Sequence, residues 1–503
     1  MTTTQNPDTA QVGTAGRAHI ERMGLFGHVI DGKVRASADG ATMPVIDPST
    51  GEQIATAAKG SAADVERAVT SARAAFDDGR WRLLPPLEKE ARLRRLAQLV
   101  ERDRTIFGDL DVFDSGLLRS YTVFLEDFAI NATNYFAGWP SKLQGTVPPV
   151  PPGFSAQHWR EPVGVVGIIV PWNGPTAVMG FVAAALAAGN SVVLKPAEDT
   201  PMSAVLMAEL AVEAGIPEGV FNVVHGEGRD VGAPLVEHRD VALVSFTGSV
   251  ETGRAIAAAA AKGPKPVSLE LGGKSPFIVF ADADLDAAAA AAAAGVWSGQ
   301  GQICTAGSRV LVDRSIHDEF VAKVVAASEN LSVGSPFDPA TDLGPLVSAV
   351  QLERVSGYVE LGRSEGASVA LDGGRVGEKG FFHAPVIFTG VRNDMRIAQE
   401  EIFGPVMSII PFDGETEAIR IANDVEYGLA AGVFTGDVGR SQRMAQALRA
   451  GTVWINTYQM GYPTVSYGGV KNSGFGRTLG EEMVHELTSI KSVWTAYPTQ
   501  SPD

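Results

Sequence analysis

Short apolar runs alternate with alanine- and leucine-rich segments from about residue 160, and this alternation constrains the fold more than any other feature. The runs at 163–170, 191–195, 220–224 and 241–246 are apolar throughout, and each is followed by a segment of helical character. Strands that are apolar on both faces belong to parallel sheets with helices on both sides. The sequence therefore predicts an α/β fold built on a doubly wound parallel sheet.

A second series of the same kind begins near residue 275. Strand-like runs at 275–280 and 309–312 alternate with helical segments at 287–294 and 315–329. A length of 503 residues is enough for two or three domains, so we expect a second α/β domain here. A proline-rich segment at 148–152 breaks any helix and is expected to connect modules.

Charge and hydropathy exclude several classes of protein. The chain has 41 Lys+Arg and 58 Asp+Glu, a formal net charge of −17, which argues against a nucleic-acid partner. Prolines 171 and 175 interrupt the most apolar stretch, so no membrane span is expected. Residues 1–25 resemble a disordered tail rather than a signal peptide, and a cytoplasmic location is predicted.

The chain contains a single cysteine, Cys304, which excludes an internal disulfide and a cysteine-built metal cluster. The eight histidines form no H-x-x-H pair, so no metal site is predicted. A lone cysteine is more often a buried structural thiol than a nucleophile. Two other residues favour the nucleophile: Glu270, an acid in an apolar and glycine-rich segment, and Asn173, which follows an apolar strand.

Each of these two residues also has an ordinary structural explanation. Glu270 could be a charge on an edge strand, and an asparagine between tryptophan and glycine commonly forms a turn. Desolvation would instead raise the pKa of Glu270 into the range of a general base, and the Asn173 amide could donate to an oxyanion.

Two glycine motifs leave ligand binding open. Residues 226–232 form G-x-G-x-x-x-G, one residue longer than the dinucleotide fingerprint. Residues 248–253 have the glycine spacing of a P-loop, but Arg254 and Ala255 replace its Lys-Ser/Thr. A strand-to-helix turn at 246–249 still offers free backbone N–H groups to an anion.

Nine motifs, taken together and in order, resemble the NAD(P)-dependent aldehyde dehydrogenase superfamily over most of the chain. They are Pro171-Trp-Asn173, Lys195-Pro-Ala-Glu198, Phe246-Thr-Gly-Ser249, Glu270-Leu-Gly-Gly-Lys274, Gly301-Gln-Ile-Cys304, Glu400-Glu-Ile-Phe-Gly-Pro405, Asn423 with Tyr427-Gly-Leu429, Trp454-Ile-Asn456 and the segment 468–477.

The resemblance implies a role for each matching residue. Cys304 would be the nucleophile and Glu270 the general base, and Asn173 with the Cys304 N–H would form the oxyanion hole. The residues implied to bind the cofactor are Trp172, Lys195, Glu198, Gly228, Gly248, Ser249, Leu271, Glu401 and Phe403. Glu198 would accept hydrogen bonds from ribose hydroxyls and repel a 2′-phosphate, so NAD is expected in preference to NADP.

The substrate implied is an aldehyde, and two departures from the family pattern bear on it. Gly174 stands where many relatives carry a bulky residue, and Thr478 stands where many carry Glu, which removes any proton relay through that acid. We expect a large or hydrophobic aldehyde, aromatic ones included. The residues expected to line its pocket are Gly174, Phe181, Ile303, Thr305 and Tyr467, with Tyr458 and Tyr462 as further aromatic candidates.

The resemblance also implies three parts and a homodimer or homotetramer. Residues 26–139 and 161–270 would bind NAD, 271–480 would form the catalytic domain, and 140–160 with 481–503 a small β oligomerisation element. Two alternatives stay open: a CoA-acylating semialdehyde dehydrogenase, which Glu270 argues against, and a catalytically silent NAD-binding scaffold.

Overall fold

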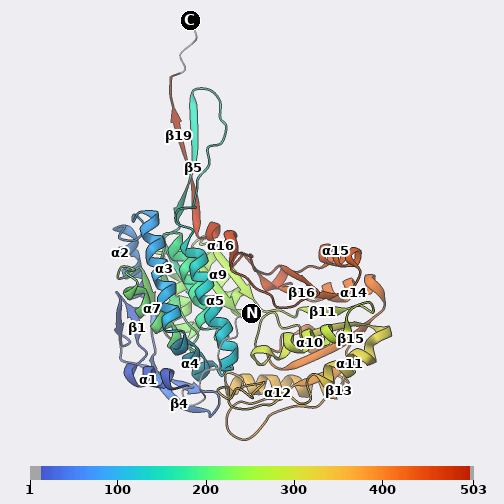
Figure 1. Ribbon diagram of the computed structural model, residues 1–503. Helices are drawn as coiled ribbons and strands as arrows, with labels where there is room; N and C mark the ends of the chain where they lie inside the picture. Colours follow the sequence, from blue (N-terminus) through green and yellow to red (C-terminus); the bar gives the residue numbers. More distant parts are fainter. Residues whose placement is uncertain (1–12, 499–503) are drawn as a thin grey trace.

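Two large sheets, each covered by helices, organise the part of the chain that the computed structural model describes, residues 13–498 (Figure 1). The first sheet has eight strands in the order β18-β10-β9-β6-β7-β8-β1-β2. These strands are β1 (His28–Ile30), β2 (Lys33–Arg35), β6 (Val165–Ile169), β7 (Ser191–Lys195), β8 (Phe221–Val223), β9 (Val241–Gly248), β10 (Val267–Leu271) and β18 (Gly474–Phe475). The strands from β10 to β8 are parallel, and the order changes direction between β6 and β9, which confirms the predicted doubly wound sheet.

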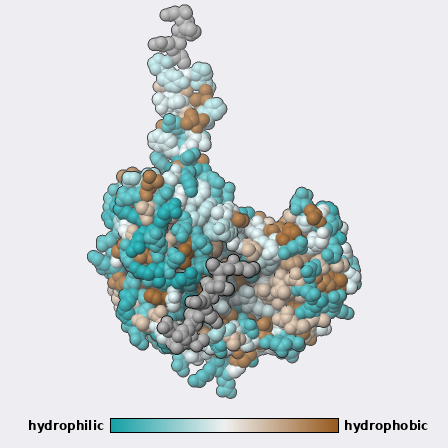
Figure 2. All heavy atoms as spheres, in the orientation of Figure 1, coloured by the Kyte–Doolittle hydropathy of each residue, from teal (hydrophilic) through white to brown (hydrophobic). Residues whose placement is uncertain are grey.

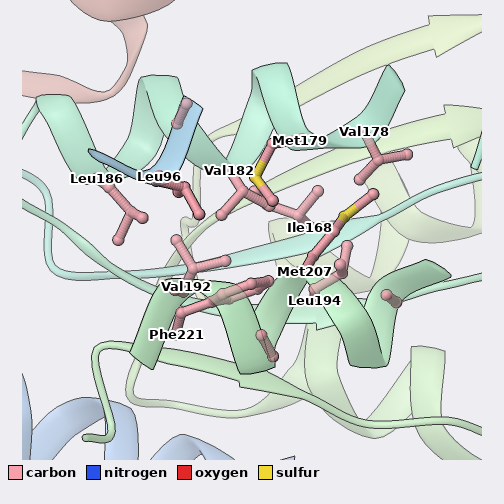
Figure 3. Close-up of a cluster of buried hydrophobic side chains, with 14 of the residues drawn as sticks. Leu96, Ile168, Val178, Met179, Val182, Leu186, Val192, Leu194, Met207 and Phe221 are labelled. Carbon is pink, nitrogen blue, oxygen red and sulfur yellow. The ribbon is translucent and has the colours of Figure 1, made fainter. Parts of the chain in front are cut away.

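Helices cover both faces of this sheet, because its central strands are apolar on both sides. All five residues of β6 are buried. Val166 and Ile168, the second of which is labelled in Figure 3, pack on one face, and Val165 packs on the other. The helices of this body are α1 (Thr14–Met23), α2 (Ala62–Asp77), α3 (Pro86–Arg102), α4 (Arg104–Ser115), α5 (Arg119–Ala137), α6 (Met179–Ala187), α7 (Met202–Glu213), α8 (Ala233–Glu237), α9 (Val250–Ala261) and α16 (Gly480–Glu486).

Helix α4 carries three buried aspartates that accept hydrogen bonds at the starts of other helices. Asp109 accepts from Gly16 N in α1 at 3.0 Å, Asp111 from Thr176 N at 3.1 Å and Asp114 from Met202 N at 3.3 Å. These carboxyl groups satisfy N–H groups that have no partner within their own helices.

The expectation of a tail through residue 25 is wrong for residues 14–23, which form α1. Asp109 holds the start of this helix, and Ile20 and Met23 pack against the first core, so tertiary contacts order a segment of low hydrophobicity. Residues 1–12 lie outside the described part of the chain.

The second sheet has seven strands in the order β13-β14-β15-β12-β11-β16-β17, parallel except for β13. Its strands are β11 (Pro276–Val279), β12 (Arg309–Asp313), β13 (Ser368–Leu371), β14 (Val386–Thr389), β15 (Val406–Phe412), β16 (Ala430–Phe434) and β17 (Thr452–Ile455). Its helices are α10 (Leu285–Trp297), α11 (His317–Ala326), α12 (Ala349–Ser364), α13 (Arg396–Gln399), α14 (Gly414–Asn423) and α15 (Val438–Ala447). This is the second α/β body that the sequence predicts.

The end of the segment expected to be catalytic returns to the first sheet. Strand β18 pairs antiparallel with β10, with Glu270 opposite Gly474. Met483, Val484 and Leu487 then pack into the core of the first body. The boundary expected at 480 therefore does not separate two packed units, because β18 and α16 belong with the first sheet.

A long two-stranded arm projects from the first body (Figure 1). It consists of β5 (Phe154–Pro162) and β19 (Thr488–Ala496), paired antiparallel along their whole length. Figure 2 shows brown apolar side chains among hydrophilic ones on this arm. Helix α16 packs with the first body and is not part of this arm, and residues 499–503 lie outside the described chain. That 140–160 and 481–503 form an oligomerisation element stays a prediction.

A hairpin of β3 (Thr42–Asp47) and β4 (Glu52–Ala58) completes the strands of the described residues. Between residues 13 and 498 no helix is both long and apolar enough to cross a membrane.

Candidate active site

A cavity of about 630 Å³ lies between the two bodies, beside the carboxyl ends of β6, β9 and β10. The loop after β6 contributes Trp172 and Asn173, the end of β9 contributes Gly248, and β10 contributes Glu270. The carboxyl ends of parallel strands at a change of direction are where such sheets bind ligands. The second body contributes Cys304 to the same cavity.

Cys304 lies on a tight loop between α10 and β12. Gly299, Gln300 and Gly301 have left-handed backbone φ values of 57°, 58° and 73°. A side chain on Gly301 would meet the Gly404 carbonyl oxygen, because a Cβ there would lie 2.2 Å from it. The Nδ2 atom of Asn173 donates to the Gln302 carbonyl oxygen at 2.8 Å, which places Asn173 against the cysteine loop.

The Cys304 thiol faces other titratable groups. Its Sγ lies 3.3 Å from the Tyr467 hydroxyl. Burial, with smaller contributions from Glu401 and Glu270, raises the pKa of the thiol to about 11, although the Tyr467 hydrogen bond acts in the opposite direction. In this state of the protein the cysteine is therefore a thiol, and a nucleophilic thiolate requires that its proton be taken by a base.

Glu270, which lines the same cavity, is a candidate for that base. Its side chain is only 5% exposed, and neither carboxylate oxygen has a hydrogen-bond partner within residues 13–498. Burial raises the pKa of this carboxyl well above its usual value, and Arg477 opposes the shift. A carboxyl without partners beside a cavity can take a proton from a thiol or from water.

The cavity wall formed by Gly248 and Ser249 begins helix α9. Ser249 caps this helix, its Oγ accepting from Thr252 N at 3.1 Å. Thr247 and Leu271 line the cavity as well. A helix start beside small residues offers backbone N–H groups to a phosphate.

Glu401 and Phe403 lie on a loop that α12 holds in place. Gln351 donates to the Phe403 carbonyl oxygen at 2.6 Å, and Arg354 donates to that of Glu401 at 2.6 Å. The Glu401 carboxylate accepts from Gly273 N at 2.9 Å, and burial raises its pKa to about 7. Phe403 has a left-handed φ of 62°. Its ring meets that of Trp172 edge-on, with the ring centroids 5.3 Å apart.

Three residues expected to bind the cofactor lie outside this cavity. Lys195 ends β7, and its Nζ contacts the Glu198 carboxylate at 3.2 Å. Gly232 packs near the Lys195 side chain, and Gly228 borders open space, with no atom within 4 Å of a Cβ built there. These residues follow β7 and β8, so a ligand reaching them from the cavity must extend along the carboxyl edge of the sheet.

The substrate-pocket predictions are only partly realised in the structure. Phe181, Ile303, Thr305 and Tyr467 line the cavity, but Gly174 does not. Tyr458 does not line the cavity either. It lies behind the loop that carries Cys304, and its hydroxyl donates to the Thr305 carbonyl oxygen at 2.9 Å. Tyr462 is 64% exposed and does not line the cavity.

Sequence reasoning missed several lining residues: Tyr121, Phe124, Phe128, Ser298, Gln459 and Leu479. Three of them are aromatic residues on one face of α5, at spacings of three and four. That helical periodicity was a signal that could have found them. Within residues 13–498 no cluster of three or more His, Cys, Asp or Glu residues is arranged to hold a metal ion.

Comparisons with known proteins agree on one family. Residues 34–493 match the model of the aldehyde dehydrogenase family. The mitochondrial benzaldehyde dehydrogenase of Antirrhinum majus is 44% identical over 471 residues, 93% of this chain and 88% of the relative. Cytosolic aldehyde dehydrogenase 1 of Rattus norvegicus is 45% identical, over 91% of this chain and 92% of the relative. The indole-3-acetaldehyde dehydrogenase of P. syringae, solved with NAD+ and IAA, superposes with a TM-score of 0.92 at 42% identity, covering 96% and 100% of the two chains.

Proposed function

The chain belongs to the aldehyde dehydrogenase family, and we propose that it oxidises an aldehyde to a carboxylic acid through a thioester on Cys304, with NAD as hydride acceptor. One observation carries this proposal: Cys304, Glu270 and Asn173 line one cavity. Cys304 comes from a loop of the second body, whereas Glu270 on β10 and Asn173 on the loop after β6 come from the first. Relatives solved with NAD+ support the choice of cofactor.

The first step is attack by sulfur on the aldehyde carbon. Glu270 takes the Cys304 proton, directly or through water, and the carbonyl oxygen becomes an oxyanion. The second N–H of the Asn173 amide and the Cys304 backbone N–H are the donors expected to stabilise it. The amide is oriented for this by its bond to the Gln302 carbonyl oxygen.

The residues present fit a dinucleotide. The α9 start at Gly248 and Ser249 suits a pyrophosphate, Glu401 can accept from ribose hydroxyls, and Lys195 with Glu198 can bind the second ribose. When bound, NAD accepts the hydride that the substrate carbon loses. Trp172 and Phe403 border the part of the cavity where the nicotinamide would lie.

Hydrolysis completes the reaction. The proton that Glu270 took from Cys304 first leaves to solvent. Glu270 then takes a proton from water, the resulting hydroxide adds to the thioester carbon, and the C–S bond breaks to release the acid and the Cys304 thiolate. The raised pKa of Glu270 suits this role, because a base with a pKa nearer neutrality accepts a proton more readily than an ordinary carboxylate.

The substrate class that the cavity favours is a large, apolar and preferably aromatic aldehyde. Around Cys304 the wall is aromatic and aliphatic, from Tyr121, Phe124, Phe128, Phe181, Ile303, Tyr467 and Leu479. Among the described lining residues the charged ones are Glu270, Arg354 and Glu401. Relatives named for benzaldehyde and indole-3-acetaldehyde support an aromatic substrate.

A panel of aldehydes read by NADH absorbance tests this function. Benzaldehyde and indole-3-acetaldehyde should give higher kcat/KM than acetaldehyde or a semialdehyde that carries a carboxylate. Cys304→Ala should abolish NADH formation, and CoA should not accelerate it, because Glu270 supplies water as the acyl acceptor. NADH formation by Cys304→Ala would refute the nucleophile, and strong stimulation by CoA would favour the acylating alternative.

The projecting arm supports the predicted homo-oligomer. Phe154, Trp159, Ile490 and Trp494 are between 47% and 60% exposed on it, as expected of a surface that another subunit covers. Light scattering should give a dimer or tetramer mass, and a monomer would contradict the assignment. The cytoplasmic location stays a prediction.

A further inference from the structure

A second cavity of about 470 Å³ lies next to the main one, between the start of α5 in the first body and α10 in the second (Figure 1). Small-molecule sites typically have volumes of roughly 300–1,000 Å³, so this space can hold a ligand of its own. We call it the alanine groove. Its principal walls are Leu118 and Tyr121 at α5 and Ala290, Ala293, Ala294 and Trp297 on α10.

The groove exists because α10 presents alanines where larger side chains would fill the space. Residues 287–294 are eight consecutive alanines. Those at 288, 289, 292 and 293 pack into the core of the second body, whereas Ala290 and Ala294, one turn apart, are exposed. Exposed helix positions are ordinarily polar or charged. The exposed side of α10 is instead an apolar and uncharged surface beside the active-site cavity.

The walls of the main cavity continue into the groove. Tyr121 and Ser298 line both spaces. Along α5 the aromatic rings form a row, with centroids 5.9 Å apart between Tyr121 and Phe124 and 6.4 Å apart between Phe124 and Phe128. On the opposite side, Ser298 follows α10 and leads into the loop that carries Cys304. A ligand that starts at Cys304 and extends along the aromatic row therefore reaches the groove.

The groove is suited to an uncharged, apolar group. Among its described lining residues the charged one is Asp342. The carboxylate of Asp342 already accepts from Ser332 N at 2.9 Å and from Ser332 Oγ at 2.8 Å. The indole N–H of Trp297 is engaged as well, since it donates to Ser328 Oγ at 2.9 Å. A charged group in the groove would lose hydration without gaining a free partner of opposite charge.

We propose that the alanine groove binds the distal part of the aldehyde, and that the preferred substrates are neutral aldehydes with two aromatic rings. This inference rests on the proposed function and narrows its substrate class. The first ring lies in the main cavity near Cys304, and the second lies against Ala290 and Ala294. A short flexible link between the rings lets the substrate pass Tyr121 and Ser298.

The wild-type enzyme gives the first test, with 4-(benzyloxy)benzaldehyde compared with benzaldehyde. Burial of the second ring should raise kcat/KM about tenfold. The gain should come from a lower KM, because contacts far from the reacting carbon are the same in the ground state and the transition state. The same two-ring aldehyde with a carboxylate on its second ring should lose this gain.

Ala294→Phe is the second test, because phenylalanine at this exposed position fills the groove. Ala294 does not line the main cavity, so kcat/KM for benzaldehyde should stay unchanged. For 4-(benzyloxy)benzaldehyde we expect KM to rise about tenfold. The matched control is Ala287→Phe, at an exposed alanine of the same helix that does not line the groove. It should match the wild type with both aldehydes. If Ala294→Phe does not fold, Ala290→Phe takes its place.

Binding of an unreactive ligand gives a readout that does not depend on catalysis. Calorimetry with 4-(benzyloxy)benzyl alcohol should show about tenfold weaker binding to Ala294→Phe than to the wild type. Binding of benzyl alcohol, which lacks the second ring, should not change. This measurement separates a defect in the groove from a defect in the chemistry at Cys304.

The groove assignment is refuted if the wild type shows no gain for the two-ring aldehyde, or if Ala294→Phe leaves its KM unchanged. Equal losses for benzaldehyde and 4-(benzyloxy)benzaldehyde in Ala294→Phe also contradict it, because the substitution would then act on the main cavity. Failure of the proposed function gives a different result: the wild type would form no NADH with any aldehyde, whether or not the two-ring alcohol binds.

Discussion

The Sγ atom of Cys304 lies 3.3 Å from the phenolic oxygen of Tyr467, and this hydrogen bond lowers the pKa of a thiol that burial otherwise raises. Tyr467 stands at the end of a long loop of the second body. Its backbone pairs with that of Thr478. The tyrosine thus connects Cys304 to the loop that returns to the first sheet.

Tyr467→Phe should slow alkylation of Cys304 about fivefold near pH 8, because a hydrogen bond to the thiolate is worth about 1 kcal/mol. In the wild type the rate with iodoacetamide should rise about tenfold per pH unit from about pH 7 to 10, since the thiol pKa is about 11 and the thiolate is the reactive form. A rate in the wild type that is flat over this range would contradict the raised pKa.

Glu270→Gln should separate the two halves of the reaction. Glutamine cannot accept a proton from Cys304 or from water, so steady turnover should fall by about 10²–10⁴. A burst of NADH should persist at a lower rate, because the small fraction of Cys304 that is already thiolate can still attack the aldehyde. In the wild type, kcat should decrease as the pH falls through the raised pKa of Glu270, because the protonated form is inactive as a base. Stopped-flow absorbance measures burst and turnover together, and full turnover by the variant would rule out this base.

Phe124→Ala should impair aromatic substrates selectively. Phe124 lines the cavity from α5 and is 49% exposed, so its removal shortens the aromatic wall at little cost in stability. We expect kcat/KM for benzaldehyde to fall about tenfold and that for acetaldehyde to change little. Val123→Ala, an exposed neighbour outside the cavity wall, is the control; equal losses for both aldehydes in Phe124→Ala would contradict the predicted contact.

Glu198→Gln should relax the preference for NAD. The Glu198 carboxylate, next to Lys195, would repel a 2′-phosphate, so its neutralisation should raise kcat/KM with NADP about tenfold. The ratio of kcat/KM for the two cofactors is the measurement. Equal values for both cofactors in the wild type would show that Glu198 does not discriminate.

Asp111→Asn should flatten the pH dependence of stability. Burial raises the pKa of Asp111 to about 7 in the folded protein, so its contribution to stability is complete below about pH 4 and decreases as the pH rises through 7. Asparagine resembles the protonated form, so the urea midpoint of the variant should decline less between about pH 5 and 8 than that of the wild type. Asp318→Asn, at a fully exposed carboxylate, should reproduce the wild-type slope.

Part of the active site could be predicted from local sequence. The apolar run that contains β6 ends at Ile169, and Asn173 follows it, so a doubly wound sheet places this residue at the ligand-binding edge. The aromatic residues on α5 could not be assigned to the pocket from their spacing alone. The same periodicity is found whether a helix face packs in the core, lies on the surface or lines a pocket. Gly174 and Tyr458 were misplaced, because no local pattern says on which side of a loop a residue lies.

The sequence by itself determined the parallel sheets, since continuous apolar runs can be buried only between two layers of helices. The sequence also indicated which side chains could take part in the chemistry. Cys304, Glu270 and Asn173 each stand in a motif that resembles one of the family. Only the tertiary structure decided that β18 pairs with β10, that α1 is held by Asp109, and that Glu486 contacts Ser268. These contacts join residues 93 to more than 200 positions apart, and they depend on how helices and strands pack rather than on the sequence near either partner.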